Sequence, residues 1–104
     1  MRYSKRKWGS YLTLLSGRHF KVKILRFNNM EPLSMQHHLH RNELWLFLKG
    51  DGYLMKGKKK CIVKKGDYVY IPKEKGHQYF PLTKTTVLEI QFGDKCEEGD
   101  IVRT

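Results

Sequence analysis

The fold is constrained most by one pattern: short apolar runs recur between turn signals, and no stretch of the 104 residues has sustained 3.6-residue periodicity. The runs are rich in valine, isoleucine, tyrosine, phenylalanine and leucine, which favour β-strands. Glycines at positions 50, 57 and 66 predict hairpin-like turns. Many short strands with regular turns are typical of a sandwich or closed barrel, so the predicted fold class is all-β. The expected strands are 10–15, 19–28, 33–39, 43–49, 52–56, 60–64, 67–71, 77–80 and 85–92.

The chain length and mass, 104 residues and 12.4 kDa, predict a single domain over residues 1–104. No apolar run approaches the roughly 18–20 residues that a membrane helix needs. The basic N-terminal segment has no apolar stretch behind it, unlike a signal peptide. Cys61 and Cys96 lack a metal-type or redox-type spacing, which predicts two reduced thiols in a cytoplasmic protein.

The formal net charge of +11 predicts a surface that attracts anions such as nucleic acids, acidic proteins and sugar phosphates. The lysine-rich segment 56–60 surrounds Gly57 and is interpreted as the solvated tip of a hairpin. No helix-turn-helix, zinc-finger or aromatic RNA-binding motif accompanies the charge, so a nucleic-acid partner is not expected.

Candidate metal ligands and acid–base groups crowd into one short segment. Alternate residues of a strand share a face, so Gln36, His38 and His40 are expected to project together, with His37 on the other side. Glu43 follows an expected bend at residues 41–42, and strand parity alone does not place it. A four-ligand site would need a distant histidine, for which the sequence offers His19 and His77.

The spacing of these residues resembles the two motifs of the cupin superfamily, G-x5-H-x-H-x3,4-E-x6-G and G-x5-P-x-G-x2-H-x3-N. A register that begins at His38-x-His40 leaves only two residues before the glutamate, which the first motif does not allow. The resemblance therefore implies a jelly-roll, or double-stranded β-helix, barrel whose metal ligands are Gln36, His38, Glu43 and His77. The matching segments are Gln36-x-His38-x4-Glu43-x6-Gly50 and Gly66-x5-Pro72-x4-His77.

A closer resemblance extends from residue 8 to residue 103. Residues 8–23 are similar to the WGxY…GxxFKVK opening of the type II mannose-6-phosphate isomerase cupin domain. Residues 33–45 resemble its LSLQxHxHRxEHW segment, and residues 88–93 resemble IEVQxG. In that family a glutamine is expected at the first ligand position, as found at Gln36. The resemblance implies metal-dependent isomerisation of mannose 6-phosphate to fructose 6-phosphate.

Several departures from these patterns leave alternatives open. Met30 and Glu74 replace motif glycines, and Leu44 replaces the usual histidine after the glutamate. The family sequence usually continues beyond IVR to a D-x-Y-G-R segment with a phosphate-binding arginine, so altered activity is expected for a chain ending at Thr104. The family domain commonly follows a sugar-nucleotide transferase domain, but no glycine-rich nucleotide-binding segment is present, so transferase activity is not expected. A non-catalytic cupin that binds a carbohydrate or sugar phosphate, and another cupin enzyme such as an epimerase, remain open.

The expected chemistry assigns roles to further residues. Nitrogen and oxygen ligands without thiolate favour one Zn²⁺ ion, with Mn²⁺, Fe²⁺, Co²⁺ and Ni²⁺ as alternatives. Lys21 and Lys23 share one side of a strand, and with Arg41 they are the candidates for binding the substrate phosphate. Proton transfer needs a nearby acid–base group, for which Glu89 is preferred to His40.

A homodimer is also predicted, because a small barrel has an apolar surface left to cover. Phe92, Ile101 and Val102 are the residues expected to make this contact.

Overall fold

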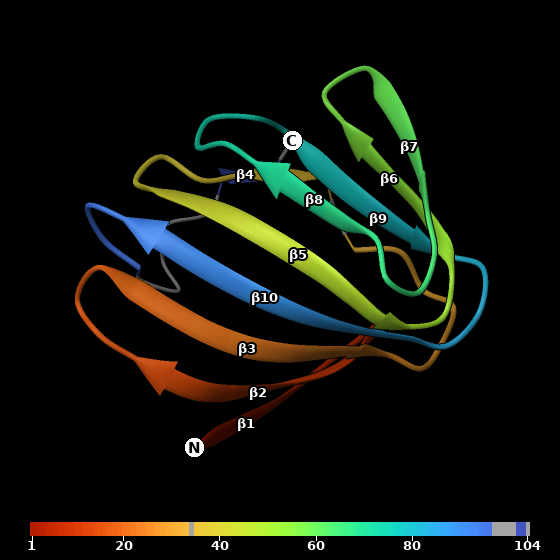
Figure 1. Cartoon of the computed structure of the whole chain (residues 1–104), viewed down its shortest axis with the longest axis horizontal. Coiled ribbons are helices and arrows are strands. Elements are labelled where there is room, and N and C mark those ends of the chain that lie inside the picture. The colour runs from red at the N-terminus through yellow and green to blue at the C-terminus, as the bar shows by residue number, and fades with distance from the viewer. Residues whose placement is uncertain (34, 97–101, 104) are drawn as a thin grey trace.

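The computed structural model describes residues 1–33, 35–96 and 102–103, and these form only β-strands and connecting segments (Figure 1). The predicted all-β class is confirmed. The described part contains no helix of the length and apolar character that a membrane span requires. The strands are β1 (Arg2–Arg6), β2 (Gly9–Ser16), β3 (Phe20–Phe27), β4 (Gln36–His37), β5 (Arg41–Lys49), β6 (Gly52–Lys56), β7 (Lys59–Val63), β8 (Tyr68–Ile71), β9 (His77–Pro81), β10 (Thr85–Gly93) and β11 (Val102–Arg103).

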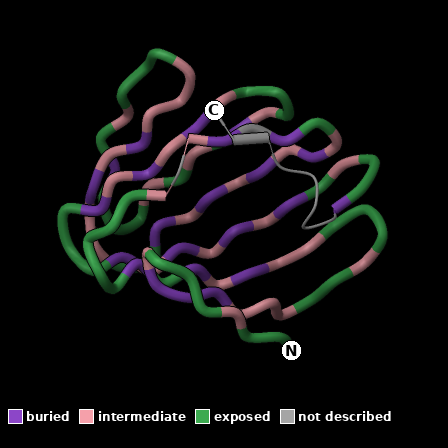
Figure 2. The backbone as a smooth tube through the Cα atoms, turned by 180° about the vertical axis from the view of Figure 1, so that it is seen from behind, coloured by how far each residue is buried: buried purple, intermediate pink, exposed green. Residues whose placement is uncertain are grey.

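The strands form two antiparallel sheets that face each other. The first sheet has the order β1-β2-β3-β10-β5-β8, and the second has the order β11-β4-β9-β6-β7. Strand β10 lies between β3 and β5, so segments far apart in the sequence are direct neighbours at the centre of the larger sheet. Figure 2 shows buried and half-buried residues alternating along these central strands, as expected when one sheet face is inside the molecule.

The inward positions of the central strands change in character from one end to the other. At one end of the sheet, Val87 on β10 is flanked by Leu25 on β3 and Phe47 on β5. Phe47 and Phe27 pack against Tyr79 of the opposite sheet, with ring centroids 5.5 and 4.9 Å from that of Tyr79. This end forms the hydrophobic core.

At the other end, the same alternation buries polar side chains. Glu89 and Gln91 follow Val87 on β10, and their partners on β5 are Trp45 and Glu43. On β3, Lys23 is the partner of Glu89 and is also buried. The fold therefore places a polar interior directly beside an aromatic core.

Most expected strands are present, with ends displaced by one or two residues. Three expectations differ from the structure. Strands β1 and β11 were not predicted: the sequence of β1, RYSKR, is basic, and β11 has only two residues. The expected strand 33–39 is reduced to β4, Gln36–His37, and the bend falls at residues 39–40 rather than 41–42. The carbonyl of His38 accepts a hydrogen bond from the amide of Glu74, which lies in the turn between β8 and β9.

The three glycines predicted to form turns, at positions 50, 57 and 66, all have positive φ. At Gly50, whose φ is 86°, a side chain would collide with the backbone carbonyl of Lys84. Met30 and Glu74, with φ of 57° and 68°, are the non-glycine residues of the described chain that share this left-handed conformation. These are the two positions where the cupin motifs have glycine, so both substitutions introduce backbone strain beside the polar interior.

We expect Glu74→Gly to stabilise the protein by about 0.5–1 kcal/mol. The left-handed conformation costs a non-glycine residue about 1–2 kcal/mol, and the greater entropy of glycine in the unfolded chain offsets about 0.5–1 kcal/mol of the gain. The free energy of unfolding in urea measures the change. Lys73→Gly, at an exposed neighbour without positive φ, is the matched control and should lower stability. A loss of stability in both variants would contradict the strain at Glu74.

Candidate metal centre

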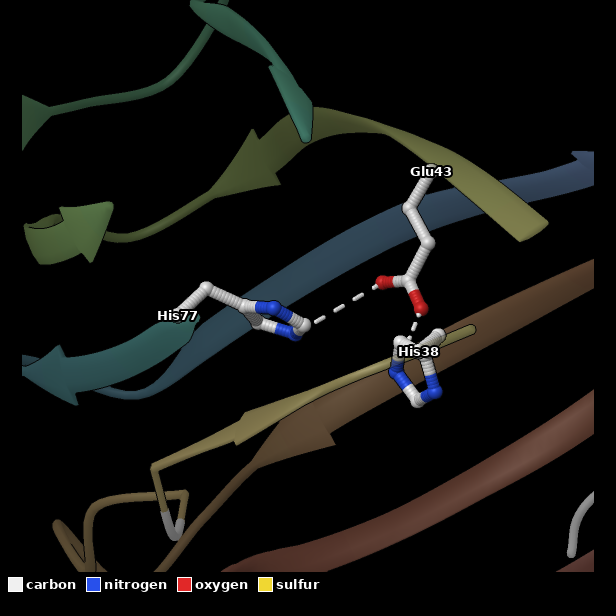
Figure 3. Close-up of side chains that lie close together, drawn as sticks. All are labelled: His38, Glu43 and His77. Atoms are coloured by element: carbon white, nitrogen blue, oxygen red, sulfur yellow. Dashed lines mark ion pairs between the residues drawn. The ribbon is translucent and has the colours of Figure 1, made fainter. Parts of the chain in front are cut away.

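Three buried side chains, His38, Glu43 and His77, lie close together where the two sheets meet (Figure 3). Nε2 of His38 is 2.9 Å from Oε2 of Glu43, and Nε2 of His77 is 3.8 Å from Oε1. Glu43 is near the start of β5, His77 begins β9, and His38 follows β4. Three separate elements thus direct two imidazoles onto one carboxylate.

The donor atoms of this cluster fit a divalent ion. One atom from each residue lies within 4.8 Å of the other two. An ion that is about 2.0–2.2 Å from nitrogen and oxygen ligands holds them about 3–4 Å apart, so small side-chain rotations would suffice. Gln36 is buried on β4 directly opposite His77, and it lines one cavity together with His77 and the other clustered residues. The amide oxygen of Gln36 is therefore a candidate fourth ligand.

Two further side chains hold the carboxylate of Glu43 in place. Nε1 of Trp45 donates a hydrogen bond of 2.9 Å to Oε1, and Nε of Arg41 donates one of 3.1 Å to Oε2. The guanidinium of Arg41 also lies 3.2 Å from Nε2 of His38. Supporting contacts of this kind fix the orientation of a metal-binding carboxylate before an ion arrives.

The protonation states of the cluster also suit metal binding. Burial raises the pKa of Glu43, but the hydrogen bond with His38 and the charges of His77, His38 and Arg41 outweigh it and leave that pKa well below its ordinary value. Burial lowers the pKa of His77, although Glu43 partly opposes this shift. Near neutral pH these shifts favour an ionised Glu43 and a neutral His77, the forms that coordinate metal ions.

The cluster forms part of the wall of a cavity of about 530 Å³. Glu89 and Gln91 line it beside the candidate ligands, and Nε2 of Gln91 donates a hydrogen bond of 2.7 Å to Oε1 of Glu89. Burial raises the pKa of Glu89 to about 8; the charge of Glu43 adds to this shift and that of Lys23 opposes it. The amide oxygen of Gln91 is a buried acceptor without a hydrogen-bond partner among the described residues.

The other site residues predicted from the sequence lie at different places, and only some of them line the cavity. Lys23 lines the cavity, whereas Lys21 lines a different groove. Arg41 lines the cavity, but its guanidinium contacts the candidate metal ligands. His40 lies in the bend before β5 and is not among the residues that line the cavity, because the strand expected to align it with His38 ends earlier. The side chain of His37 lies outside the described part of the structure.

Comparison with known proteins agrees with this geometry. A model of the family described as "Mannose-6-phosphate isomerase C-terminal" matches residues 2–104. The chain belongs to this family.

The mannose-6-phosphate isomerase C-terminal family includes parts of much longer relatives. A mannose-1-phosphate guanylyltransferase of Sinorhizobium fredii is 33% identical over 100 residues, which are 94% of this chain and 20% of that protein. Mannose-1-phosphate guanylyltransferase 2 of Escherichia coli O157:H7 is 31% identical over 103 residues, 94% of this chain and 21% of its own length. The chain spans about a fifth of these curated relatives.

Solved structures establish the barrel type. A cupin superfamily protein of Desulfitobacterium hafniense has a TM-score of 0.75 at 19% identity, covering 81% of this chain and 76% of its own. KdgF of Halomonas sp. has a TM-score of 0.78 at 10% identity, covering 89% and 88%. The predicted cupin fold is confirmed.

The departure of this chain from the family pattern at Leu44 lies outside the cavity. Leu44 alternates with the inward-facing Glu43 and Trp45 on β5, so its side chain is on the outer face of the sheet. The substitution changes the outer surface of the barrel and leaves the lining of the cavity unaltered.

Strand parity predicts that Gln91 faces the cavity beside Glu89, and both residues line it. Sequence reasoning missed other residues of the lining. Arg6 and Tyr11 also line the cavity, but no local pattern relates β1 and β2 to the metal ligands, which lie across two further strands.

We expect His77→Ala to abolish stoichiometric binding of Zn²⁺, because it removes one of the three clustered donors. His19→Ala should retain the ion, since His19 is exposed and its Nδ1 contacts the carbonyls of Gly93 and Asp94 instead. Elemental analysis of the purified variants measures metal content, with circular dichroism as the control for folding. Equal metal content in the two variants would contradict the assignment of His77 as a ligand.

Proposed function

We propose that the protein is a metal-dependent sugar-phosphate isomerase that interconverts mannose 6-phosphate and fructose 6-phosphate. One observation carries the proposal: a single cavity contains the candidate ligands around Glu43 and, on the neighbouring strand, a second buried carboxylate, Glu89. Membership of the family and the similarity to mannose-1-phosphate guanylyltransferases support a substrate of the mannose phosphate class.

The reaction moves a proton between C1 and C2 of the sugar, and negative charge develops on the adjacent oxygens. A divalent ion held by His38, Glu43 and His77, with Gln36 as the proposed fourth ligand, would stabilise that charge. The mixed nitrogen and oxygen donor set favours Zn²⁺. Catalysis further requires a group of this chain that accepts the proton from one carbon and returns it to the other.

Glu89 is the proposed proton carrier. It is 5% exposed, lines the cavity and accepts a hydrogen bond from Gln91 that orients its carboxylate. The pKa of about 8 that burial and the charge of Glu43 give Glu89 lies close to neutral pH, where a group can both accept and release a proton. Positive charge at the adjacent ligands would favour the ionised form needed to accept the proton.

Gln91 offers a complementary contact for the substrate. Its amide oxygen is buried, and no described residue donates a hydrogen bond to it. An unsatisfied buried acceptor costs about 1–3 kcal/mol, and a sugar hydroxyl placed between Glu43 and Glu89 would remove this cost. A polyhydroxylated ligand thus matches the polar half of the cavity better than an apolar one.

A sugar-phosphate-binding module without turnover is the second candidate. It is favoured by the buried acceptor of Gln91 and the lining cations Lys23 and Arg41, which suit a bound sugar phosphate and do not themselves require turnover. The two functions share the same cavity contacts and differ only in whether Glu89 transfers a proton.

We expect Glu89→Gln to lower turnover of mannose 6-phosphate by about 10²–10⁴-fold, the usual contribution of a general acid–base group. Metal content should remain normal, because the amide keeps the size of the side chain and Glu89 is not a candidate ligand. A coupled assay for fructose 6-phosphate, with Zn²⁺-, Mn²⁺- or Co²⁺-loaded protein, measures the effect.

The comparison variant is His40→Ala, which alters the other acid–base group expected from the sequence. Its turnover should stay near that of the wild type, because His40 is not among the residues that line the cavity. Loss of turnover in His40→Ala with activity retained in Glu89→Gln would reverse the assignment. Wild-type protein that binds mannose 6-phosphate without forming fructose 6-phosphate would favour the binding module.

A further inference from the structure

Two cations converge on one aromatic ring at the end of the cavity away from the candidate metal ligands. Nζ of Lys23 lies 4.0 Å from the centroid of the Tyr11 ring, and Cζ of Arg6 lies 5.1 Å from it. The guanidinium of Arg6 also donates a hydrogen bond of 3.2 Å to the Tyr11 hydroxyl. Neighbouring strands β1, β2 and β3 each contribute one of these residues.

The order of strands separates the chemical groups along the cavity. Glu43 is on β5, Glu89 on β10, Lys23 on β3, Tyr11 on β2 and Arg6 on β1, and these strands are consecutive neighbours. All five residues line the same cavity. Neighbouring strands are about 4.8 Å apart, so this order places Lys23 directly beside Glu89 and Arg6 furthest from Glu43.

We propose that Arg6, Tyr11 and Lys23 form a subsite that binds the phosphate of the substrate. The proposal rests on the proposed function for the identity of the sugar phosphate. Lys23 is only 4% exposed, and its ammonium together with the guanidinium of Arg6 places two positive charges at this end of the cavity. Charge-assisted hydrogen bonds from two cations would hold a dianionic phosphate while the sugar carbons extend toward Glu89.

Tyr11 explains how the cations are held before a ligand binds. A cation over an aromatic face is attracted to it by about 0.5–2 kcal/mol, and the hydroxyl fixes Arg6 by a hydrogen bond. Long flexible side chains held in this way lose less entropy on binding. The subsite differs from the set of phosphate-binding residues expected from the sequence. Lys21 lines another groove, and Arg41 contacts the candidate metal ligands.

The test compares Arg6→Ala with Lys5→Ala. Lys5 is an exposed cation on the same strand but does not line the cavity, so its loss changes the net charge equally. We expect Arg6→Ala to weaken binding of mannose 6-phosphate and of inorganic phosphate by about 10–100-fold, as measured by calorimetry, because a charge-assisted hydrogen bond is lost. Binding of unphosphorylated mannose should not change, and Lys5→Ala should resemble the wild type.

Further variants separate the possible outcomes. Tyr11→Phe keeps the ring but removes the hydrogen bond to Arg6, so its phosphate affinity should fall less than that of Arg6→Ala. Equal phosphate affinity in Arg6→Ala and Lys5→Ala, or no phosphate binding by the wild type, would overturn the subsite. The wild type could instead bind mannose 6-phosphate without isomerising it, while only Arg6→Ala loses phosphate affinity. That result would refute the proposed isomerase activity and leave the subsite standing.

A different observation, on the outer face of the larger sheet, carries a second inference. Register pairing joins outward apolar residues of β3, β10, β5 and β8 into one continuous face: Leu88 pairs with Ile24 and Leu46, and Ile90 pairs with Val22 and Leu44. The remaining members of this outer apolar face are Phe20, Leu48, Tyr68, Tyr70 and Phe92.

The geometry points to a second copy of this chain as the partner of the outer apolar face. Strands of eight, nine, nine and four residues, with the usual spacing and rise, cover about 480 Å² per copy, or about 950 Å² in a dimer, at the lower limit of a specific interface. The centre of the face is uncharged, and the outward Arg26 lies near the end of β3, so the apolar centres of two faces can pack although each chain carries a net charge of +11. Of the residues expected to form a dimer, Phe92 belongs to this face; Ile101 and the side chain of Val102 lie outside the described part.

We expect the wild type to sediment with about twice the 12.4 kDa mass of one chain, and Leu46→Lys to sediment as a monomer. Ile62→Lys, an exposed apolar residue on β7 of the other sheet, should remain dimeric. Added salt should strengthen the wild-type dimer, because it screens the repulsion between two basic chains. A wild-type monomer at micromolar concentration, or a dimeric Leu46→Lys protein, would overturn this inference.

Discussion

The site depends on the buried carboxylate of Glu43. Burying an ionised carboxylate is costly unless its oxygens are paired, and Glu43 is 1% exposed. Trp45, Arg41 and His38 approach its two oxygens at 2.9–3.1 Å, and His77 lies slightly further away. These contacts tie β5, β9 and the segment after β4 to one point. A metal ion bound here would add further bonds between segments that contacts with Glu43 already hold together.

The same carboxylate relates the candidate ligands to the rest of the cavity. The charge of Glu43 contributes to the raised pKa of Glu89, since both face the interior from adjacent strands. Lys23 opposes this shift from the next strand and is also held against Tyr11. A change in charge at the metal ligands therefore alters the pKa of Glu89. Electrostatics alone thus couple the candidate metal site to the proposed proton transfer.

The sequence was sufficient for those features that depend on short-range spacing. Alternating apolar residues and turn glycines located most strands, and the distances from Gln36 to His77 along the chain identified residues that the structure brings together. It was insufficient where distant segments decide the conformation. The bend at residues 39–40 accompanies a hydrogen bond from Glu74 to the carbonyl of His38, and parity within the local segment could not reveal it. Arg6 reaches the cavity only because β1 joins the sheet beside β2, a pairing that its basic sequence does not indicate.

The departures at Met30 and Glu74 show how stability and site geometry are balanced in this barrel. The polar half of the interior contributes little hydrophobic stabilisation, so the aromatic residues Phe27, Phe47 and Tyr79 must supply it at the other end. Strain at the two left-handed residues adds a further cost beside the polar half. Because the amide of Glu74 bonds to the carbonyl of His38, relaxing this turn would move the backbone that carries a candidate ligand. The position of His38 therefore depends on the left-handed conformation of this turn, and glycine at position 74 would keep that conformation without the strain.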